Sequence, residues 1–196
     1  MKIKLTAGTL LAPIPAVLVS CGDDQTSNLF TAAWTGIINT KPPMLYVSIR
    51  KTRHSHGIIS RTGEFAVNLT TAEMIRSVDL CGVKSGKDTD KFALGGFHRA
   101  EASEISAPIV EESPLSLECR VREIKELGSH DMFIADIVCV DADESILCGS
   151  GKIDLKKAGL AAYSHGEYFS LGKRLGSFGF SVAKKHKHNN RGRKKQ

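Results

Sequence analysis

Several sequence patterns that would indicate a function are missing from this chain of 196 residues. It has no run of eighteen apolar residues, which excludes an ordinary transmembrane helix, so we predict no membrane partner. Its five cysteines form no CxxC pair, which excludes a zinc knuckle, and we predict no metal site. The GxGxxG fingerprint of dinucleotide sites, the GxSxG elbow of hydrolases and the HExxH motif of zinc peptidases are also absent.

Two segments come close to a motif without meeting it. Residues 82–89 read GVKSGKDT, but three residues separate the two glycines where a phosphate-binding P-loop requires four. His54 and His56 lie two residues apart, with no cysteine or third histidine at ligand spacing. A nucleotide-like ligand, if one binds, therefore needs a different geometry from that of a P-loop or a Rossmann site.

The positive charge of the chain belongs to its C-terminal end. The formal net charge is +6, but residues 184–196 hold seven of the 27 Lys and Arg and no acid. Residues 1–183 then carry 20 basic and 21 acidic side chains, a net charge of −1. We predict one folded domain over 1–183 and a basic, disordered tail over 184–196. The tail could bind polyanions without specificity, but no base-reading module accompanies it, so no specific nucleic-acid partner is predicted.

The N-terminus has some features of a bacterial lipoprotein signal, with a basic start, an apolar middle and a cysteine after Leu-Val-Ser. Pro13 and Pro15 interrupt the apolar stretch, which a helical signal core tolerates poorly. Residues 16–20 are better interpreted as a buried strand that ends in a turn over 22–24. We therefore predict a cytoplasmic protein.

The cysteines are odd in number and scattered, which predicts reduced thiols in a cytoplasmic or anaerobic setting. Three of them lie in strand patterns and are predicted to be core thiols: Cys21, Cys119 and Cys139. Cys81 and Cys148 are candidates for exposed thiols.

Short apolar segments separated by turn residues dominate the first two-thirds of the chain. They predict four strands, over residues 16–21, 28–35, 44–50 and 65–69. Thr70 or Thr71 can cap a short helix over 72–80, which Gly82 ends. Residues 83–97 are polar and glycine-rich, which predicts a long loop of the kind that often carries function.

The last third of the domain predicts a hairpin and an irregular segment. Apolar and polar residues alternate over 115–122, the period of a half-buried strand. A turn over 128–131 and a second strand over 132–141 complete an antiparallel hairpin, whereas 158–171 is aromatic-rich and irregular. Many short strands with few helices predict a mainly β fold, a closed or split antiparallel barrel.

Two segments combine residue types that suit a ligand. Residues 28–36, NLFTAAWTG, join the only tryptophan to small residues that let a ligand approach the backbone, although a core strand with one buried tryptophan has the same pattern. Residues 48–59, SIRKTRHSHGII, place arginines and hydroxyls where a helix begins, which suits a phosphate monoester. A solvated basic loop is the alternative for this second segment.

Together these segments resemble the flavin reductase-like FMN-binding split-barrel family, and within it the flavoredoxin-type proteins. The resemblance covers most of the chain and excludes only the tail. Its motifs are APIPAVLVSCG at 12–22, NLFTAAWTG at 28–36, PPMLYVSIRKTRHSHGII at 42–59, EFAVNL at 64–69, CGVKSGKDTDKF at 81–92 and YSHGEYFSLGKRLGSFGFS at 163–181. The resemblance implies a Greek-key antiparallel split barrel with a few short helices, assembled as a homodimer with FMN near the interface.

The same resemblance implies the residues of the FMN site. Those that would contact the flavin or line its pocket are Asn28, Thr31, Ala32, Ala33 and Trp34. The segment that would approach the ribityl phosphate contributes Ser48, Ile49, Arg50, Arg53 and Ser55. Lys91, His130 and Tyr163 would lie near the flavin ring. A surface lysine beside a core aromatic is the alternative for Lys91, and a simple hairpin-turn residue is the alternative for His130.

The implied function is electron transfer through bound FMN. Reduced flavin builds negative charge at N1 and the C2 carbonyl, so a nearby lysine or protonated histidine would favour reduction. The donor would be NAD(P)H or a redox protein. A flavoredoxin-like carrier holds FMN tightly, whereas an NAD(P)H:flavin oxidoreductase supplies reduced flavin to a partner, and both alternatives stay open. No catalytic residue is predicted, and a polyanion-binding protein that acts through its tail is the alternative of another class.

Overall fold

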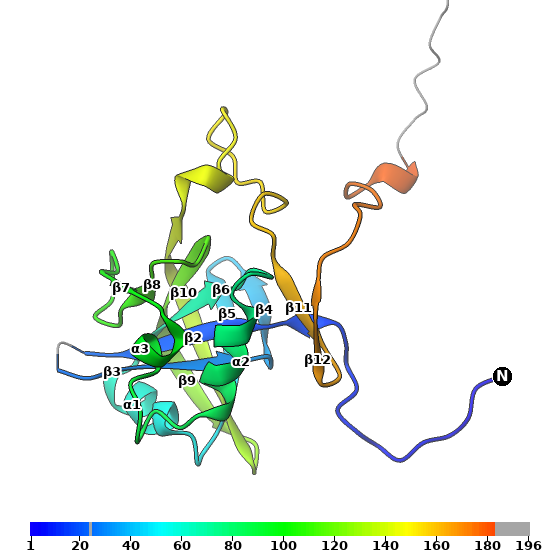
Figure 1. Ribbon diagram of the computed structural model, residues 1–196. Helices are drawn as coiled ribbons and strands as arrows, with labels where there is room; N and C mark the ends of the chain where they lie inside the picture. The colour runs from blue at the N-terminus through cyan, green and yellow to red at the C-terminus, as the bar shows by residue number, and fades with distance from the viewer. Residues whose placement is uncertain (24, 183–196) are drawn as a thin grey trace, which may run out of the picture.

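One antiparallel sheet forms most of the molecule, and its strand order is β3-β2-β6-β9-β10-β5-β4 (Figure 1). The computed structural model describes residues 1–23 and 25–182, so the predicted tail over 184–196 lies outside the described residues. The strands of this sheet are β2 (Val17–Gly22), β3 (Ser27–Ala32), β4 (Thr35–Thr40), β5 (Pro43–Arg50), β6 (Glu64–Leu69), β9 (Leu115–Glu126) and β10 (His130–Ala142). The mainly β, antiparallel architecture predicted from the sequence is confirmed.

Two small sheets and five short helical segments complete the described chain. The strands of the small sheets are β1 (Ile14–Pro15), β11 (Ala161–Ser164) and β12 (Glu167–Ser170), and β7 (Arg99–Ala100) with β8 (Ile109–Val110). The helical segments are α1 (His54–Thr62), α2 (Ile75–Val83), α3 (Lys91–Gly95), and the 3₁₀ turns η1 (Glu144–Ile146) and η2 (Phe180–Val182). None of the helices within residues 1–23 and 25–182 reaches the length and hydropathy that a bilayer crossing requires.

Strand β2 separates two apolar cores because successive side chains of a strand point to opposite faces. Val17 and Val19 face the main core, which includes Phe65 and Phe133. Leu18 faces the other side and belongs to a second core, which α2 and α3 cover. The other principal buried members of this second core are Leu29, Val78 and Phe92. Both helices are thereby held against β2 and β3, beside the strand that carries the NLFTAAWTG segment.

The strand predicted over 28–35 is two strands. Strand β3 ends at Ala32, and the Trp34 carbonyl accepts a hydrogen bond of 2.9 Å from the Ser48 amide. Thr35 then begins β4, and its hydroxyl donates to the Tyr46 carbonyl at 2.5 Å. The break exposes Trp34, because a residue between two strands is not obliged to point into either sheet.

The helix predicted over 72–80 is α2, which begins later and ends later than the sequence indicates. Thr70 does not cap it, because the Thr70 hydroxyl donates to the Ala16 carbonyl at 2.7 Å and ties the chain to the sheet. The residue before the helix, Met74, makes no side-chain cap, and the helix continues through Gly82 to Val83. Tertiary contacts thus shift both ends of the helix.

Two predicted irregular segments contain regular structure. The loop predicted over 83–97 contains α3, which Asp90 caps by accepting hydrogen bonds from the Phe92 and Ala93 amides. The stretch over 158–171 contains the β11–β12 hairpin, turned at His165 and Gly166. The hairpin predicted over 115–141 is confirmed as β9 paired with β10.

Candidate functional site

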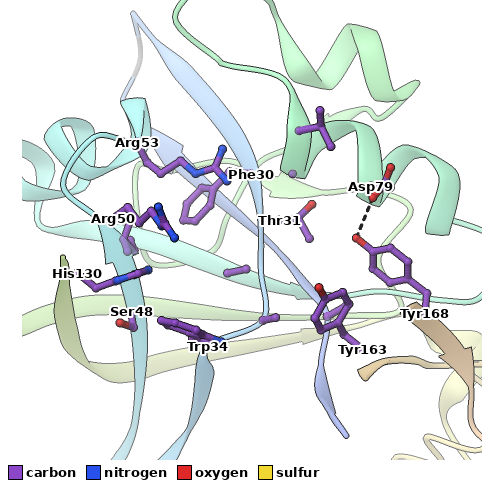
Figure 2. Close-up of a pocket in the computed structure, with 16 residues that line it drawn as sticks. Phe30, Thr31, Trp34, Ser48, Arg50, Arg53, Asp79, His130, Tyr163 and Tyr168 are labelled. Carbon is purple, nitrogen blue, oxygen red and sulfur yellow. Dashed lines mark hydrogen bonds between the residues drawn. The ribbon is translucent and has the colours of Figure 1, made fainter. Parts of the chain in front are cut away.

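Two adjoining cavities of about 400 Å³ each lie beside β3. The first, the aromatic cavity, is lined by Trp34, Tyr163 and Tyr168 among others (Figure 2). The second, the cationic cavity, is lined by Lys84 and Lys91 among others. The residues that line both are Phe30, Arg50, Arg53 and Val83.

All thirteen residues predicted from the sequence line one or both cavities. Those that line the aromatic cavity are Thr31, Ala32, Ala33, Trp34, Ser48, Ile49, Arg50, Arg53, His130 and Tyr163. Those that line the cationic cavity are Asn28, Arg50, Arg53, Ser55 and Lys91. The tertiary structure therefore brings residues from β3, β5, α1, α3, β10 and β11 to one place.

A flat wall forms where β3 ends and β10 begins. The Trp34 ring packs on the His130 ring, with 4.6 Å between ring centroids and an interplanar angle of 37°. His130 is held there by the sheet register, which pairs it with Arg50 of β5. Figure 2 shows Ser48, Arg50, Arg53 and His130 at one end of the aromatic cavity, with Trp34 beside them.

His130 is a neutral residue at neutral pH. Partial burial lowers the pKa of His130 below its ordinary value of 6.5, and the nearby Arg50 guanidinium lowers it further. The Ser129 hydroxyl lies 2.9 Å from His130 Nδ1. The expectation of a protonated histidine beside the flavin therefore does not fit His130, and Lys91 is the stronger candidate for a positive charge.

The opposite end of the aromatic cavity carries tyrosines and a carboxylate. Tyr168 and Tyr163 form an edge-to-face pair with 5.3 Å between centroids. The Tyr168 hydroxyl donates to Asp79 at 3.2 Å, shown as the dashed line in Figure 2. Burial, followed by the Asp79 charge, raises the pKa of Tyr168 to about 12, so this phenol stays protonated. The cavity is cationic at its arginine end and can accept hydrogen bonds at its Asp79 end.

A network of buried polar side chains forms the floor of the cationic cavity. Asn28 and Ser55 are almost fully buried, and Asn28 Nδ2 donates to the Ser55 hydroxyl at 2.6 Å. The backbone at Gly86 covers Asn28 so closely that a β-carbon there would lie 2.0 Å from Asn28 Oδ1. Such close packing of a loop on a polar floor is typical of a site whose donors are held in place.

Lys91 lies in the same floor and is only 3% exposed. Its ammonium donates to the Cys81 carbonyl at 2.8 Å. Burial lowers the pKa of Lys91 to about 8, with a further contribution from the Arg53 charge. Because a buried ammonium with one neutral partner gains more from an anion than an exposed one does, Lys91 fits a ligand with negative charge. The alternative of a surface lysine is wrong.

His56 and Asp131 fix the orientation of α1, whose first turn carries Ser55. His56 Nε2 lies 2.7 Å from Asp131 Oδ2, and Lys51 lies 3.4 Å from the other oxygen. Burial would raise the pKa of Asp131, but His56 and Lys51 outweigh it and hold that pKa below its usual range. This ionised carboxylate links β10 to α1 and so positions the start of the helix at the cavity.

Gly86 provides a test of the close contact with Asn28. We expect Gly86→Ala to weaken anion retention in the cationic cavity and to lower stability by about 1–3 kcal/mol, because the added carbon overpacks the site. Thermal unfolding and phosphate affinity measure the two effects. Gly149→Ala is the matched control, since a β-carbon at Gly149 meets no atom within 4 Å. Equal behaviour of the two variants would contradict the assignment.

The sequence analysis missed several cavity residues, of which Asp79, Val83, Lys84 and Tyr168 stand out. Asp79 and Val83 are four residues apart on α2 and therefore share one helix face, a spacing that could have been read from the sequence. Nothing in the sequence indicated that this face meets β3. The contact is made by the Thr31 hydroxyl, which donates to the Val78 carbonyl.

The thiols differ in part from expectation. Cys81 is fully buried instead of exposed, and burial raises its pKa to about 11. Cys139 is partly exposed rather than a core thiol, whereas Cys21 and Cys119 are buried as predicted. A thiol with a raised pKa is protonated at neutral pH, which makes Cys81 an unreactive group beneath the cationic cavity.

A second polar cluster, which the sequence did not indicate, joins Glu118, Cys139 and Asp141. Both Glu118 oxygens accept backbone hydrogen bonds of 2.7 Å, from the Ser103 and Glu104 amides. Burial and the adjacent Glu118 raise the pKa of Asp141. The Glu118 carboxylate therefore anchors the segment at 103–104 to the sheet, and the adjacent Asp141 retains its proton more readily than an exposed aspartate does.

Comparisons with known proteins identify sequences and structures that are similar to this chain. The sequence pattern of the flavin reductase like domain family matches residues 11–172. An uncharacterized protein of Archaeoglobus fulgidus is 30% identical over 146 residues, which are 74% of this chain and 82% of the relative. The FMN reductase (NADH) RutF of Agrobacterium fabrum is 27% identical over 109 residues, 56% of this chain and 60% of the relative.

Two solved structures are similar over nearly the whole chain. The flavoredoxin of Desulfovibrio vulgaris (Miyazaki F) is 32% identical with a TM-score of 0.87, and the match covers 93% of this chain and 100% of that one. The flavoredoxin from Methanosarcina acetivorans is 30% identical with a TM-score of 0.85 and has the same coverage.

Proposed function

Because the chain belongs to the flavin reductase like domain family and has its split-barrel fold, we propose that it binds FMN and carries electrons between a reduced donor and an acceptor. The proposal places the flavin ring in the aromatic cavity and the phosphate in the cationic cavity. The observation that supports it most is the meeting of all thirteen predicted residues in two cavities that share Arg50 and Arg53.

The cationic cavity suits a phosphate monoester. Arg50, Arg53, Lys84 and Lys91 line it, and none of its lining residues is acidic. Helix α1 begins at its edge with no side chain bonded to its first amides and no acid in its first turn. Helix N-terminal amides and arginine forks are the donors that phosphate oxygens accept best in proteins.

The aromatic cavity suits the flavin ring. Trp34 and Tyr163 offer flat apolar surface on two sides, and the small residues Ala32 and Ala33 leave the backbone accessible. FMN, when bound, accepts and releases the electrons. The chain's own residues hold it, with Arg50 and Arg53, which line both cavities, as the nearest candidates for a charge that stabilises the reduced form.

The visible absorption spectrum of the purified protein tests the proposal. We expect flavin bands near about 375 and 450 nm in the protein or after FMN is added. Anaerobic bleaching by NADH would identify an NAD(P)H:flavin oxidoreductase, the alternative that the RutF relative suggests. Bleaching only by dithionite or a protein donor would identify a carrier. A protein that stays colourless with FMN present would refute the flavin proposal.

The proposal includes a second copy of the chain and a cytoplasmic location. The C-terminal segment after β12 extends away from the main sheet (Figure 1), and its apolar side chains are exposed, Leu175 to 93%. A twofold partner could cover them, as apolar surface of this kind is costly in water. Light scattering is expected to give twice the mass of one chain, and a monomeric mass would refute the dimer.

The cysteines, all within the described residues, are free thiols, which favours a reducing compartment.

A further inference from the structure

Arg99 lines neither cavity, yet its guanidinium joins two segments that form the floor of the cationic cavity. Its Nε donates to the Ser27 hydroxyl at 2.8 Å, and its Nη2 donates to Asp90 Oδ1 at 2.9 Å. Ser27 is the first residue of β3 and immediately precedes Asn28. Asp90 immediately precedes Lys91, the first residue of α3. One arginine therefore holds the chain directly before two of the buried polar residues of the floor.

The start of α3 depends on Asp90, whose Oδ1 accepts hydrogen bonds from the Phe92 amide at 2.9 Å and the Ala93 amide at 3.3 Å. The same oxygen accepts the hydrogen bond from Arg99. The Arg99 guanidinium also lies over the Phe92 ring, 4.2 Å from its centroid. Lys91 stands between these two partners of the guanidinium in the sequence, so contacts on both sides set the direction in which its side chain leaves the backbone.

The backbone of Arg99 is itself anchored to the main sheet. Arg99 pairs with Val110 in the β7–β8 sheet, and the Val110 amide donates to Asn68 Oδ1 at 2.9 Å. Asn68 is a fully buried residue of β6, an interior strand of the main sheet. The guanidinium therefore reaches β3 and α3 from a fixed point.

The ion pair that Arg99 makes is too exposed to contribute much to the stability of the whole chain. The side chains of Arg99 and Asp90 are 41% and 50% exposed. Exposed ion pairs contribute little to the free energy of unfolding, because water and salt screen them. A binding site, however, needs supporting contacts that hold its donors in the binding geometry. The contacts of Arg99 lie where they can do this for the cationic cavity.

From these contacts we propose that Arg99 is a positioning residue for the phosphate of FMN. It acts through Ser27 and Asp90, and it keeps the polar groups of Asn28 and Lys91 in the arrangement that binds the phosphate. The inference rests on the proposed function and deepens it, because it names a residue outside the cavities that controls the preference of the site for a phosphorylated flavin.

The affinities of flavin-free protein for FMN and for riboflavin test the proposal, since the two flavins differ only by the phosphate. Arg99→Ala is expected to weaken FMN binding about three- to tenfold, the range for one lost hydrogen bond, and to change riboflavin binding by less than about twofold. Arg122→Ala is the matched control. Arg122 is an exposed arginine that pairs with Asp136 at 3.0 Å and lines neither cavity, so the same charge is removed elsewhere.

Asp90→Ser separates positioning from charge. Serine also caps helices, so α3 is retained, but Arg99 loses its carboxylate partner. A positioning role predicts that Arg99→Ala and Asp90→Ser both weaken FMN binding. An effect of charge alone predicts opposite changes, because one variant removes a positive charge and the other a negative one. Ser27→Ala is a milder third variant, which removes only the acceptor of the Nε hydrogen bond and is expected to weaken FMN binding about threefold.

The protonation of Lys91 gives a readout that needs no flavin. Burial lowers the pKa of Lys91 to about 8, and Arg99→Ala is expected to raise it toward the ordinary value of 10.5, because a loosened α3 lets water reach the ammonium. The other groups whose charges act on Lys91 are unchanged in this variant: Arg53, Cys81 and Cys21. NMR titration of protein with isotope-labelled lysine measures the pKa, and Lys91→Met identifies the signal by its absence.

Four results would overturn the positioning role. They are an FMN affinity of Arg99→Ala equal to that of Arg122→Ala, an equal loss of FMN and riboflavin affinity in Arg99→Ala, a gain of FMN affinity in Asp90→Ser, and a pKa of Lys91 that Arg99→Ala leaves unchanged. If Arg99→Ala does not fold, Ser27→Ala replaces it in these comparisons. A parent protein that binds neither flavin would instead refute the proposed function, and the Lys91 titration would still test the action of Arg99 on α3.

Discussion

Replacement of Arg50 by alanine is expected to weaken FMN retention by about 10- to 100-fold. Arg50 lines both cavities and lies opposite His130 in the register of β5 and β10. A hydrogen bond to a charged group contributes about 1.5–3 kcal/mol, and roughly 1.4 kcal/mol corresponds to a tenfold change in affinity. Titration of flavin-free protein with FMN, monitored by the quenching of flavin fluorescence, measures the change in the dissociation constant.

Arg76→Ala is the control for charge alone. Arg76 is an exposed residue of α2 and lines neither cavity, so its removal changes the net charge by the same amount. We expect its FMN affinity to stay within about twofold of the parent, because screening weakens distant surface charges. An Arg50→Ala affinity equal to that of Arg76→Ala would contradict the placement of the phosphate.

The affinity for FMN is expected to fall as the pH rises above about 8. Burial lowers the pKa of Lys91 to about 8, and a phosphate beside it would raise that pKa again. The positive charge is therefore present below pH 8 and is lost above it unless phosphate binds. Proton uptake then accompanies binding, and the dissociation constant rises by up to about tenfold per pH unit between the two pKa values.

The two thiols whose charges act on Lys91 titrate above this pH range. The pKa of His130 is lowered below 6.5, and burial raises those of Cys81 and Cys21 to about 11 and about 12. Lys91→Met is expected to bind FMN about 10- to 100-fold more weakly at pH 7, the effect of losing one charged hydrogen bond. Because this variant has no ammonium to titrate, its FMN affinity is expected to be independent of pH between 7 and 9. Lys87→Met, which changes a lysine outside both cavities, should keep the parent profile. A parent affinity that is constant from pH 7 to 9 would show that Lys91 does not face the phosphate.

Local patterns predicted the elements that depend on local interactions. The alternation over 115–122 identified β9, and the turn over 128–131 identified its hairpin with β10, because a strand with one buried face has a period of two. The resemblance of the segments over 28–36 and 48–59 to the flavin reductase-like family contributed most of the thirteen predicted residues, all of which line the two cavities.

Local patterns gave wrong predictions where a contact with a residue distant in sequence uses a hydrogen-bonding group that was expected to serve a local structure such as a helix cap. Thr70 bonds the Ala16 carbonyl of a neighbouring strand instead of capping a helix. The segment over 158–171 forms a hairpin because β1 pairs with β11, and no local periodicity reports that partner.

The sequence by itself determined that this is a mainly β chain, and it predicted residue types that suit a phosphate. Only the tertiary structure decided that Lys91 is buried with a lowered pKa and that His130 is neutral. It also decided that α2 supplies Asp79 and Val83 to the same cavities. The physical reason is that burial and charge proximity are properties of neighbours in space, and these neighbours come from elements as distant in the chain as β3 and β11.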